Sequence, residues 1–159
     1  MKLKLVQFTT IILFVLVMGV FWGTWFALSR SITAFSPQTF LDIGQTAIRN
    51  LGGPMRILMP LSLVSALILI ALLPKRSAAF ALAVGGLLLM VCALVVTLAV
   101  EVPIDNQIKV WTVATLPADW EALRDRWEFY HALRTFVSIA AVGLVTGSAL
   151  SRRPVNASG

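Results

Sequence analysis

The chain has one cysteine, one histidine and only seven acidic residues among its 159 residues. With Cys92 alone, inside an apolar run, there is no internal disulfide and no paired-cysteine metal site. Charged residues make up 13% of the chain, whereas soluble globular proteins average about 25%. This scarcity of charge argues against an ordinary water-soluble domain.

Hydrophobic residues make up 58% of the chain, and the mean hydropathy is +0.89. The net charge of +6 fits lysines and arginines that flank membrane spans. We find neither a basic stripe nor an aromatic-basic platform, so we expect no nucleic-acid partner. The lipid bilayer is the expected surrounding.

Four apolar runs are long enough to cross a bilayer, which takes about 20 helical residues. The first begins like a signal peptide but is too long for one, so we count it as a span. The sequence predicts an all-α, integral-membrane four-helix bundle in one domain, 1–159. The predicted spans are 5–28, 57–73, 78–100 and 133–150, with outer segments 29–56 and 101–132.

The charges predict an orientation. All seven acids and all five tryptophans fall on one side of the predicted spans, whereas the side that carries the termini is purely basic. We therefore expect cytoplasmic termini and an outer belt of tryptophans. The basic residues of the cytoplasmic side are Lys2, Lys4, Lys75, Arg76, Arg152 and Arg153.

Small residues mark candidate helix contacts. Gly19 with Gly23, and Gly143 with Gly147, have the G-x-x-x-G spacing that lets membrane helices approach closely. The pair Gly85-Gly86 is expected to act in the same way. These pairs would also suit a homo-oligomer.

The first outer segment carries a helix-start signal, with Ser36 as cap and Pro37 at the first position. The pattern predicts a short outer amphipathic helix that ends at Gly52-Gly53-Pro54. Its polar face is either solvated at the interface or turned inward over the mouth of the bundle. That face consists of Gln38, Asp42, Gln45 and Arg49.

The second outer segment places polar groups around a proline where the third span ends. Pro103 removes a backbone donor, and Asp105 and Asn106 are expected to satisfy the groups that it frees. Asp119 is the expected cap of a long fourth helix that extends out of the membrane.

One face of that helix carries a polar stripe that includes Arg124. We expect Arg124 to pair with Glu128, and Arg126 to lie beside Tyr130 on the neighbouring face of the helix. Charged groups near a span are unfavourable unless they face the bundle interior, pair or reach water. We favour an inward-facing site, with interfacial snorkelling as the alternative for Arg134. The stripe is Trp120, Arg124, Trp127, His131, Arg134 and Ser138.

These residues resemble those of anthrone-oxygenase-like small membrane proteins, most of whose bacterial members have no assigned function. The resemblance rests on the block Val102-Pro103-Ile104-Asp105-Asn106, on Trp120, Arg124 and Arg126-Trp127, and on His131-Ala132-Leu133-Arg134-Thr135. The stretch 19–29 and Gln45 look similar to the family's first third. Asp105 stands where the family often has asparagine, and Ile48 replaces a second common asparagine.

The resemblance implies a four-helix bundle in a bacterial inner membrane. In the fungal namesakes it implies oxidation of an anthrone to an anthraquinone by O2, without an obvious metal or flavin, so the cofactor is either none or unknown. His131 would act as general base, and Arg134 and Arg126 would stabilise an enolate. Asp105 and Asn106 would hold a peroxide or carbonyl oxygen, and Trp127 would stack on the substrate. Further substrate-binding residues would be Trp120, Arg124, Glu101 and Gln45.

Two alternatives remain open at the level of the sequence. A metal site would need His131 together with Glu128, Glu101 or Asp105, which lack a recognised metal-binding spacing. A non-catalytic protein would be an accessory subunit of a larger membrane complex, or a binder of lipids or small aromatic molecules. Whether the chain is an enzyme is left open by its sequence.

Overall fold

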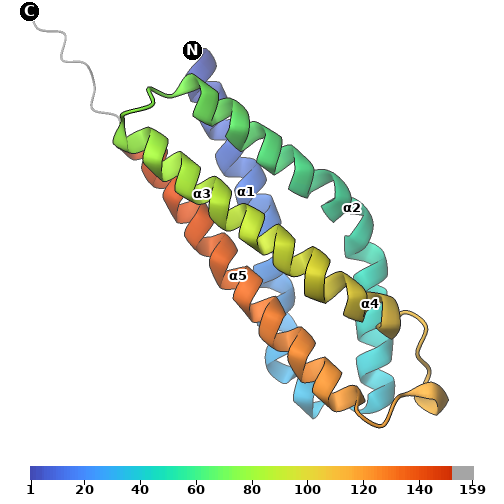
Figure 1. The fold of residues 1–159 in the computed structure, drawn as a ribbon. Helices are drawn as coiled ribbons and strands as arrows, with labels where there is room; N and C mark the ends of the chain where they lie inside the picture. Colours follow the sequence, from blue (N-terminus) through green and yellow to red (C-terminus); the bar gives the residue numbers. More distant parts are fainter. Residues whose placement is uncertain (152–159) are drawn as a thin grey trace, which may run out of the picture.

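The computed structural model describes residues 1–151, and the regular structure in this part of the chain is all helical, without strands, as predicted (Figure 1). Arg152 and Arg153, which we counted on the cytoplasmic side, lie outside the described residues. The elements are α1 (Lys2–Ala27), the 3-10 helix η1 (Ser29–Ala34), α2 (Pro37–Leu72), α3 (Ala78–Val96), the π-helix η2 (Thr97–Glu101), α4 (Val102–Ile108), the 3-10 helix η3 (Val113–Thr115) and α5 (Trp120–Leu150).

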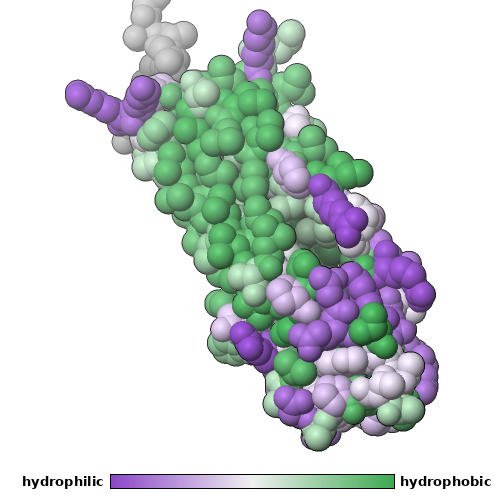
Figure 2. Space-filling view, turned by 45° about the vertical axis from the view of Figure 1, so that its right-hand side comes forward, coloured by the Kyte–Doolittle hydropathy of each residue, from purple (hydrophilic) through white to green (hydrophobic). Residues whose placement is uncertain are grey.

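Four long helices form an up-and-down bundle in which α1 contacts α2 and α5, and α3 contacts α2 and α5. All four are long and apolar enough to cross a membrane, which confirms the predicted fold class and is compatible with a multi-pass membrane protein. Figure 2 shows a hydrophobic surface along most of the bundle, an extensive hydrophilic surface at one end and a few hydrophilic side chains at the other. We call this polar end, which carries η1, α4 and the start of α5, the outer end.

The bundle interior contains two apolar clusters. The larger one follows the membrane part and includes Phe14, Val17 and Met90, which are completely buried. The smaller one lies at the outer end and includes Ile108 and Trp127. Because the lipid-facing surface is apolar too, hydrophobicity alone does not decide which helix face turns inward.

Helices α3 and α5 approach each other closely at a glycine. A Cβ atom on Gly86 would lie 2.6 Å from Val145 Cγ2 and 3.1 Å from the backbone oxygen of Ala141. Within the single chain the G-x-x-x-G pairs do not mediate the close contacts that we expected: a Cβ atom on Gly19, Gly23 or Gly143 would meet nothing within 4 Å, and one on Gly147 would make only an ordinary contact.

Helix α2 corrects a second expectation. Ser36 caps it as predicted, since the Ser36 hydroxyl accepts from the Thr39 N–H at 3.2 Å. However, the helix continues through Gly52-Gly53-Pro54 instead of ending there, and Figure 1 shows it bending in its turquoise part. Breaking a helix at membrane depth leaves several backbone groups unsatisfied, whereas one internal proline removes a single donor.

The third long helix contains a π-turn at the outer end. The Val102 N–H bonds to the carbonyl of Thr97, five residues earlier, and Pro103 follows in the first turn of α4. Asp105 and Asn106 do not cap freed backbone groups as we expected: their side chains accept from Trp127 and Lys109. The π-turn itself absorbs the irregularity next to the proline.

The start of α5 differs from expectation in one detail. Asp119 occupies the cap position, but its side chain makes no capping hydrogen bond. Its backbone carbonyl accepts from the N–H groups of Ala122 and Leu123 instead.

Candidate functional site

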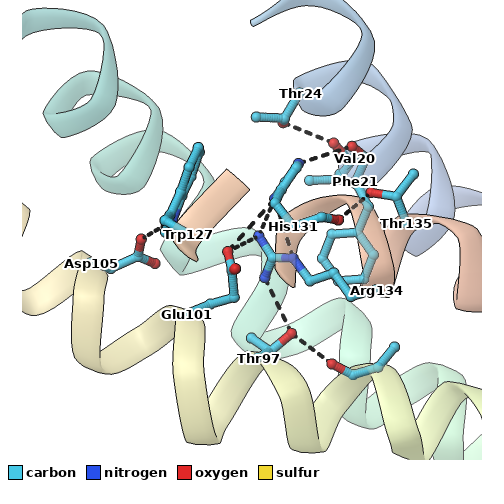
Figure 3. Close-up of polar contacts among 11 residues, drawn as sticks. Val20, Phe21, Thr24, Thr97, Glu101, Asp105, Trp127, His131, Arg134 and Thr135 are labelled. Atoms are coloured by element: carbon cyan, nitrogen blue, oxygen red, sulfur yellow. Dashed lines mark hydrogen bonds and ion pairs between the residues drawn. The ribbon is translucent and has the colours of Figure 1, made fainter. Parts of the chain in front are cut away.

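Three ionisable side chains are buried together near the outer end of the bundle. Glu101, at the last position of the π-turn, is 0% exposed, and His131 and Arg134 of α5 are 2% and 9% exposed. The spacing of three residues between His131 and Arg134 places both on the face of α5 that meets α1 and the π-turn. Figure 3 shows the three side chains converging between these elements.

Both ring nitrogens of His131 are already engaged. Nδ1 lies 2.6 Å from Nη2 and 3.2 Å from Nε of Arg134, and a guanidinium only donates. Nδ1 is therefore the acceptor, and the ring proton is on Nε2, which donates to the backbone carbonyl of Phe21 at 3.2 Å. The imidazole is consequently a neutral ring of defined tautomer, held between α1 and its own helix.

Arg134 is the centre of the cluster. Its Nη2 lies 2.9 Å from Oε2 of Glu101, and its Nη1 donates to the Thr97 hydroxyl at 3.2 Å. The guanidinium carbon stands 4.5 Å from the centre of the Phe21 ring, within the range of a cation–π contact. The snorkelling alternative for Arg134 is wrong, because this side chain is directed into the bundle and not along its surface.

Glu101 has an unused acceptor. Neither carboxylate oxygen accepts a hydrogen bond of good geometry in the part of the chain that the structure describes. Oε2 forms an ion pair with Arg134 and lies 3.7 Å from Nδ1 of His131, whereas Oε1 has no partner of either kind. Because buried polar atoms are nearly always hydrogen-bonded, Oε1 is an acceptor available to a donor group that enters the cluster.

Trp127 borders this cluster on its outer side. Its ring stacks on that of His131, with centroids 5.2 Å apart and an interplanar angle of 15°. Its indole N–H donates to Oδ1 of Asp105 at 3.0 Å, which fixes the ring orientation (Figure 3). Asp105 thus acts on the cluster through Trp127.

Trp127 also forms a wall of a small apolar cavity of about 20 Å³. This cavity lies between the end of α1, η1, the first part of α2, α4 and α5. The charged cluster and the cavity are therefore neighbours that share one aromatic side chain. The cavity is lined by Thr24, Leu28, Ile32, Phe35, Phe40, Ile43, Gly44, Ala47, Ile48, Ile108 and Trp127.

Other residues of the predicted site lie away from the cluster. Arg124 pairs with Asp125 at 2.8 Å, and not with Glu128 as expected, and its guanidinium lies over the Trp120 ring. Arg126 is exposed and lies over the ring of Tyr130, as predicted.

Two more predicted residues contribute to the architecture of the outer end. Asn106 is exposed, and its side-chain oxygen accepts from Lys109. Gln45 points inward, where its amide donates to the carbonyls of Ile108 and Trp111 at 3.0 and 2.9 Å. Gln45 therefore ties α2 to the end of α4.

Sequence reasoning missed two partners of the cluster. Thr97 lies one helical turn before Glu101, and a polar residue at that position of an apolar run was a usable signal. The Phe21 carbonyl had no sequence signal, because any residue supplies the same group. In the region of the chain that the structure covers, no three His, Cys, Asp or Glu side chains gather closely enough to hold a metal ion.

Comparison with known proteins adds one finding. The family model described as anthrone oxygenase matches residues 50–144, more than half of the chain. The matched range contains Glu101, Trp127, His131 and Arg134. Comparison with curated proteins and with solved structures finds no match.

Proposed function

This chain belongs to the anthrone oxygenase family, and we propose that it uses O2 to oxidise an aromatic substrate with a methylene group activated by a conjugated carbonyl. In the balanced reaction, the methylene and O2 become a ketone and water. The two C–H bonds and the O–O bond break, one oxygen atom enters the new carbonyl, and the other leaves as water. The carbon loses four electrons, and O2 gains them.

The observation that carries this proposal is the buried group of Glu101, His131 and Arg134. Ionisable side chains inside a membrane bundle are costly, and they usually mark functional sites. Here they provide the two elements that deprotonation of a carbon acid needs: groups able to exchange protons, and a fixed positive charge on Arg134 for the enolate oxygen.

The apolar cavity next to Trp127 supports an aromatic substrate. Its walls are hydrophobic and aromatic, which is typical of small-molecule sites. At about 20 Å³ it accommodates only a group of the size of a water molecule, so a ring enters only when the surrounding side chains move apart. The bent helix α2 supplies several of these walls.

The experiment is oxygen uptake by the protein purified in detergent, with anthrone as substrate. We expect one O2 consumed for each anthraquinone formed. Arg134→Lys keeps the charge but loses the planar fork that contacts Glu101, His131 and Thr97, and we expect it to lower turnover by about 10²-fold. The matched control Arg126→Lys, on the exposed face of the same helix, should stay within about twofold of wild type, since surface changes have small effects.

Absence of oxygen uptake by the wild-type protein would contradict the proposal, as would full turnover by the folded Arg134→Lys variant. Saturable binding of anthrone without oxygen uptake would favour the second candidate, a non-catalytic binder of lipids or small aromatic molecules. The wholly apolar lining of the cavity is the observation in favour of that candidate.

A further inference from the structure

We propose that Glu101 is the group that removes the proton from the substrate, and that His131 is a positioning residue which holds Arg134 in place. This inference rests on the proposed oxidation, and it reassigns the base that sequence reasoning had placed at His131. With Glu101 as the base and Arg134 beside it, the substrate is a neutral carbon acid whose carbonyl oxygen can contact the guanidinium.

The hydrogen bonds of His131 argue against its use as the base. A base needs a free lone pair, and the only lone pair of the neutral ring, on Nδ1, faces two nitrogens of Arg134 at 2.6 and 3.2 Å. The other nitrogen, Nε2, faces the Phe21 carbonyl, which only accepts. Protonating Nδ1 would direct a new N–H towards the two guanidinium nitrogens, which have no lone pair to offer, while the nearby acceptor, Oε2 of Glu101, is farther away at 3.7 Å and already paired with Arg134.

Glu101 has what His131 lacks. Its Oε1 is a buried acceptor without a partner among the described residues, and the carboxylate adjoins both Arg134 and the ring of His131. Figure 3 shows the carboxylate next to the guanidinium of Arg134, below the stacked rings of His131 and Trp127, and Trp127 also borders the cavity. Glu101 does not line the cavity itself, so a substrate reaches Oε1 only when the Trp127 side chain moves aside.

The distribution of charge within the site favours the same assignment. When Glu101 takes the proton, the carboxylate becomes a neutral acid while the substrate becomes an enolate, so the site contains one anion and one cation before and after the step. Arg134 is paired with an anion throughout. If His131 took the proton, an imidazolium would form directly against the guanidinium of Arg134, and like charges repel strongly in a buried site.

The steps balance with Glu101 as a proton shuttle. A substrate C–H bond breaks, its electron pair stays on the substrate as the enolate, and the proton goes to Oε1. The enolate carbon then bonds to O2 and gives a peroxide anion, which takes the proton back from Glu101. Loss of water from this hydroperoxide breaks the second C–H bond and the O–O bond, and leaves the ketone.

Hydrogen–deuterium exchange of the anthrone methylene, measured without oxygen, tests proton removal separately from oxidation. We expect the wild-type protein in D2O to accelerate the exchange, and Glu101→Gln to lose that acceleration by about 10²-fold. Glu101→Asp, which keeps a carboxylate, should recover part of it. His131→Gln should lower the rate but stay well above Glu101→Gln. The control Glu128→Gln, a carboxylate outside the cluster, should equal wild type.

A second measurement needs no variant of Glu101. When anthrone is added anaerobically to the wild-type protein, infrared difference spectra should show the carbonyl band of a protonated carboxylic acid appearing together with the enolate. The band should persist in Asp105→Asn, which removes the other nearby carboxylate. An enolate that forms without this band would overturn the assignment to Glu101, as would unchanged exchange in Glu101→Gln or a wild-type protein that does not accelerate exchange. Exchange without oxygen uptake would leave Glu101 as the base and refute the oxidation instead.

Discussion

The Nη2 atom of Arg134 lies 2.9 Å from Oε2 of Glu101, inside a bundle whose other side chains are predominantly apolar. Neither residue is stable in this place alone, because an unpaired charge in a low-dielectric interior carries a large desolvation penalty. The two residues come from different helices, so the ion pair also ties α5 to the π-turn.

Removing one partner of this pair should destabilise the protein. Arg134→Met leaves the carboxylate of Glu101 buried without its cation, and we expect a loss of about 3–5 kcal/mol in the free energy of unfolding. The double variant Glu101→Gln/Arg134→Met should recover much of this loss, because no unpaired charge remains. Thermal unfolding in detergent measures both. Equal stability of Arg134→Met and wild type would show that the ion pair does not form.

The contribution of the Trp127–Asp105 hydrogen bond to the free energy of unfolding should be measurable separately from that of ring stacking on His131. Trp127→Phe retains an aromatic ring against His131 but removes the indole N–H, so we expect destabilisation by about 1–3 kcal/mol. Asp105→Asn keeps an acceptor oxygen and should have a smaller effect. Trp22→Phe, at an exposed position of α1, is the control and should unfold as wild type does.

The approach of α3 to α5 at Gly86 should not tolerate even a methyl group. A Cβ atom there would lie 2.6 Å from Val145 Cγ2 and 3.1 Å from the Ala141 oxygen, so we expect Gly86→Ala to cost about 1–3 kcal/mol. Gly23→Ala places the same methyl group where nothing lies within 4 Å and should be neutral or slightly stabilising. The reverse order of stability in a thermal unfolding series would refute this packing.

Filling the apolar cavity should weaken substrate binding without disturbing the charged cluster. Ala47→Leu adds three carbon atoms to a wall of the cavity, so we expect the affinity for anthrone, measured by quenching of tryptophan fluorescence, to fall by about tenfold or more. Ala71→Leu makes the same change at an exposed position of the same helix and should bind as wild type does. Equal affinities would place the substrate elsewhere.

The four spans were predictable because the length of an apolar run is a property of one segment alone. The course of α2 was not. Gly52-Gly53-Pro54 is a strong stop signal in water, where freed backbone groups are hydrated, but the same residues only bend a helix whose surroundings offer no such hydration.

Some residues of the candidate site were likewise predictable from the sequence and others were not. His131 and Arg134 were predictable as a pair, since their spacing puts them on one face of a helix. Arg126 was included in the predicted site because it is an arginine like Arg134. Its position two residues after Arg124 should have excluded it, since two residues turn the helix by about 200° and place Arg126 on another face. The central role of Glu101 depends on how α3 and α5 are rotated against each other, which no single segment reveals.

The π-turn before Glu101 has a consequence for insertions and deletions. A π-turn contains one residue more than an α-turn and makes about the same rotation, so the loss of one residue within 97–101 would restore a regular α-helix and leave α4 in nearly the same orientation relative to α3. The loss of a second residue would turn α4 by about 100°, and Asp105 would no longer point at Trp127. An alignment gap of one residue there would therefore mark a chain that keeps the fold without the bulge before Glu101.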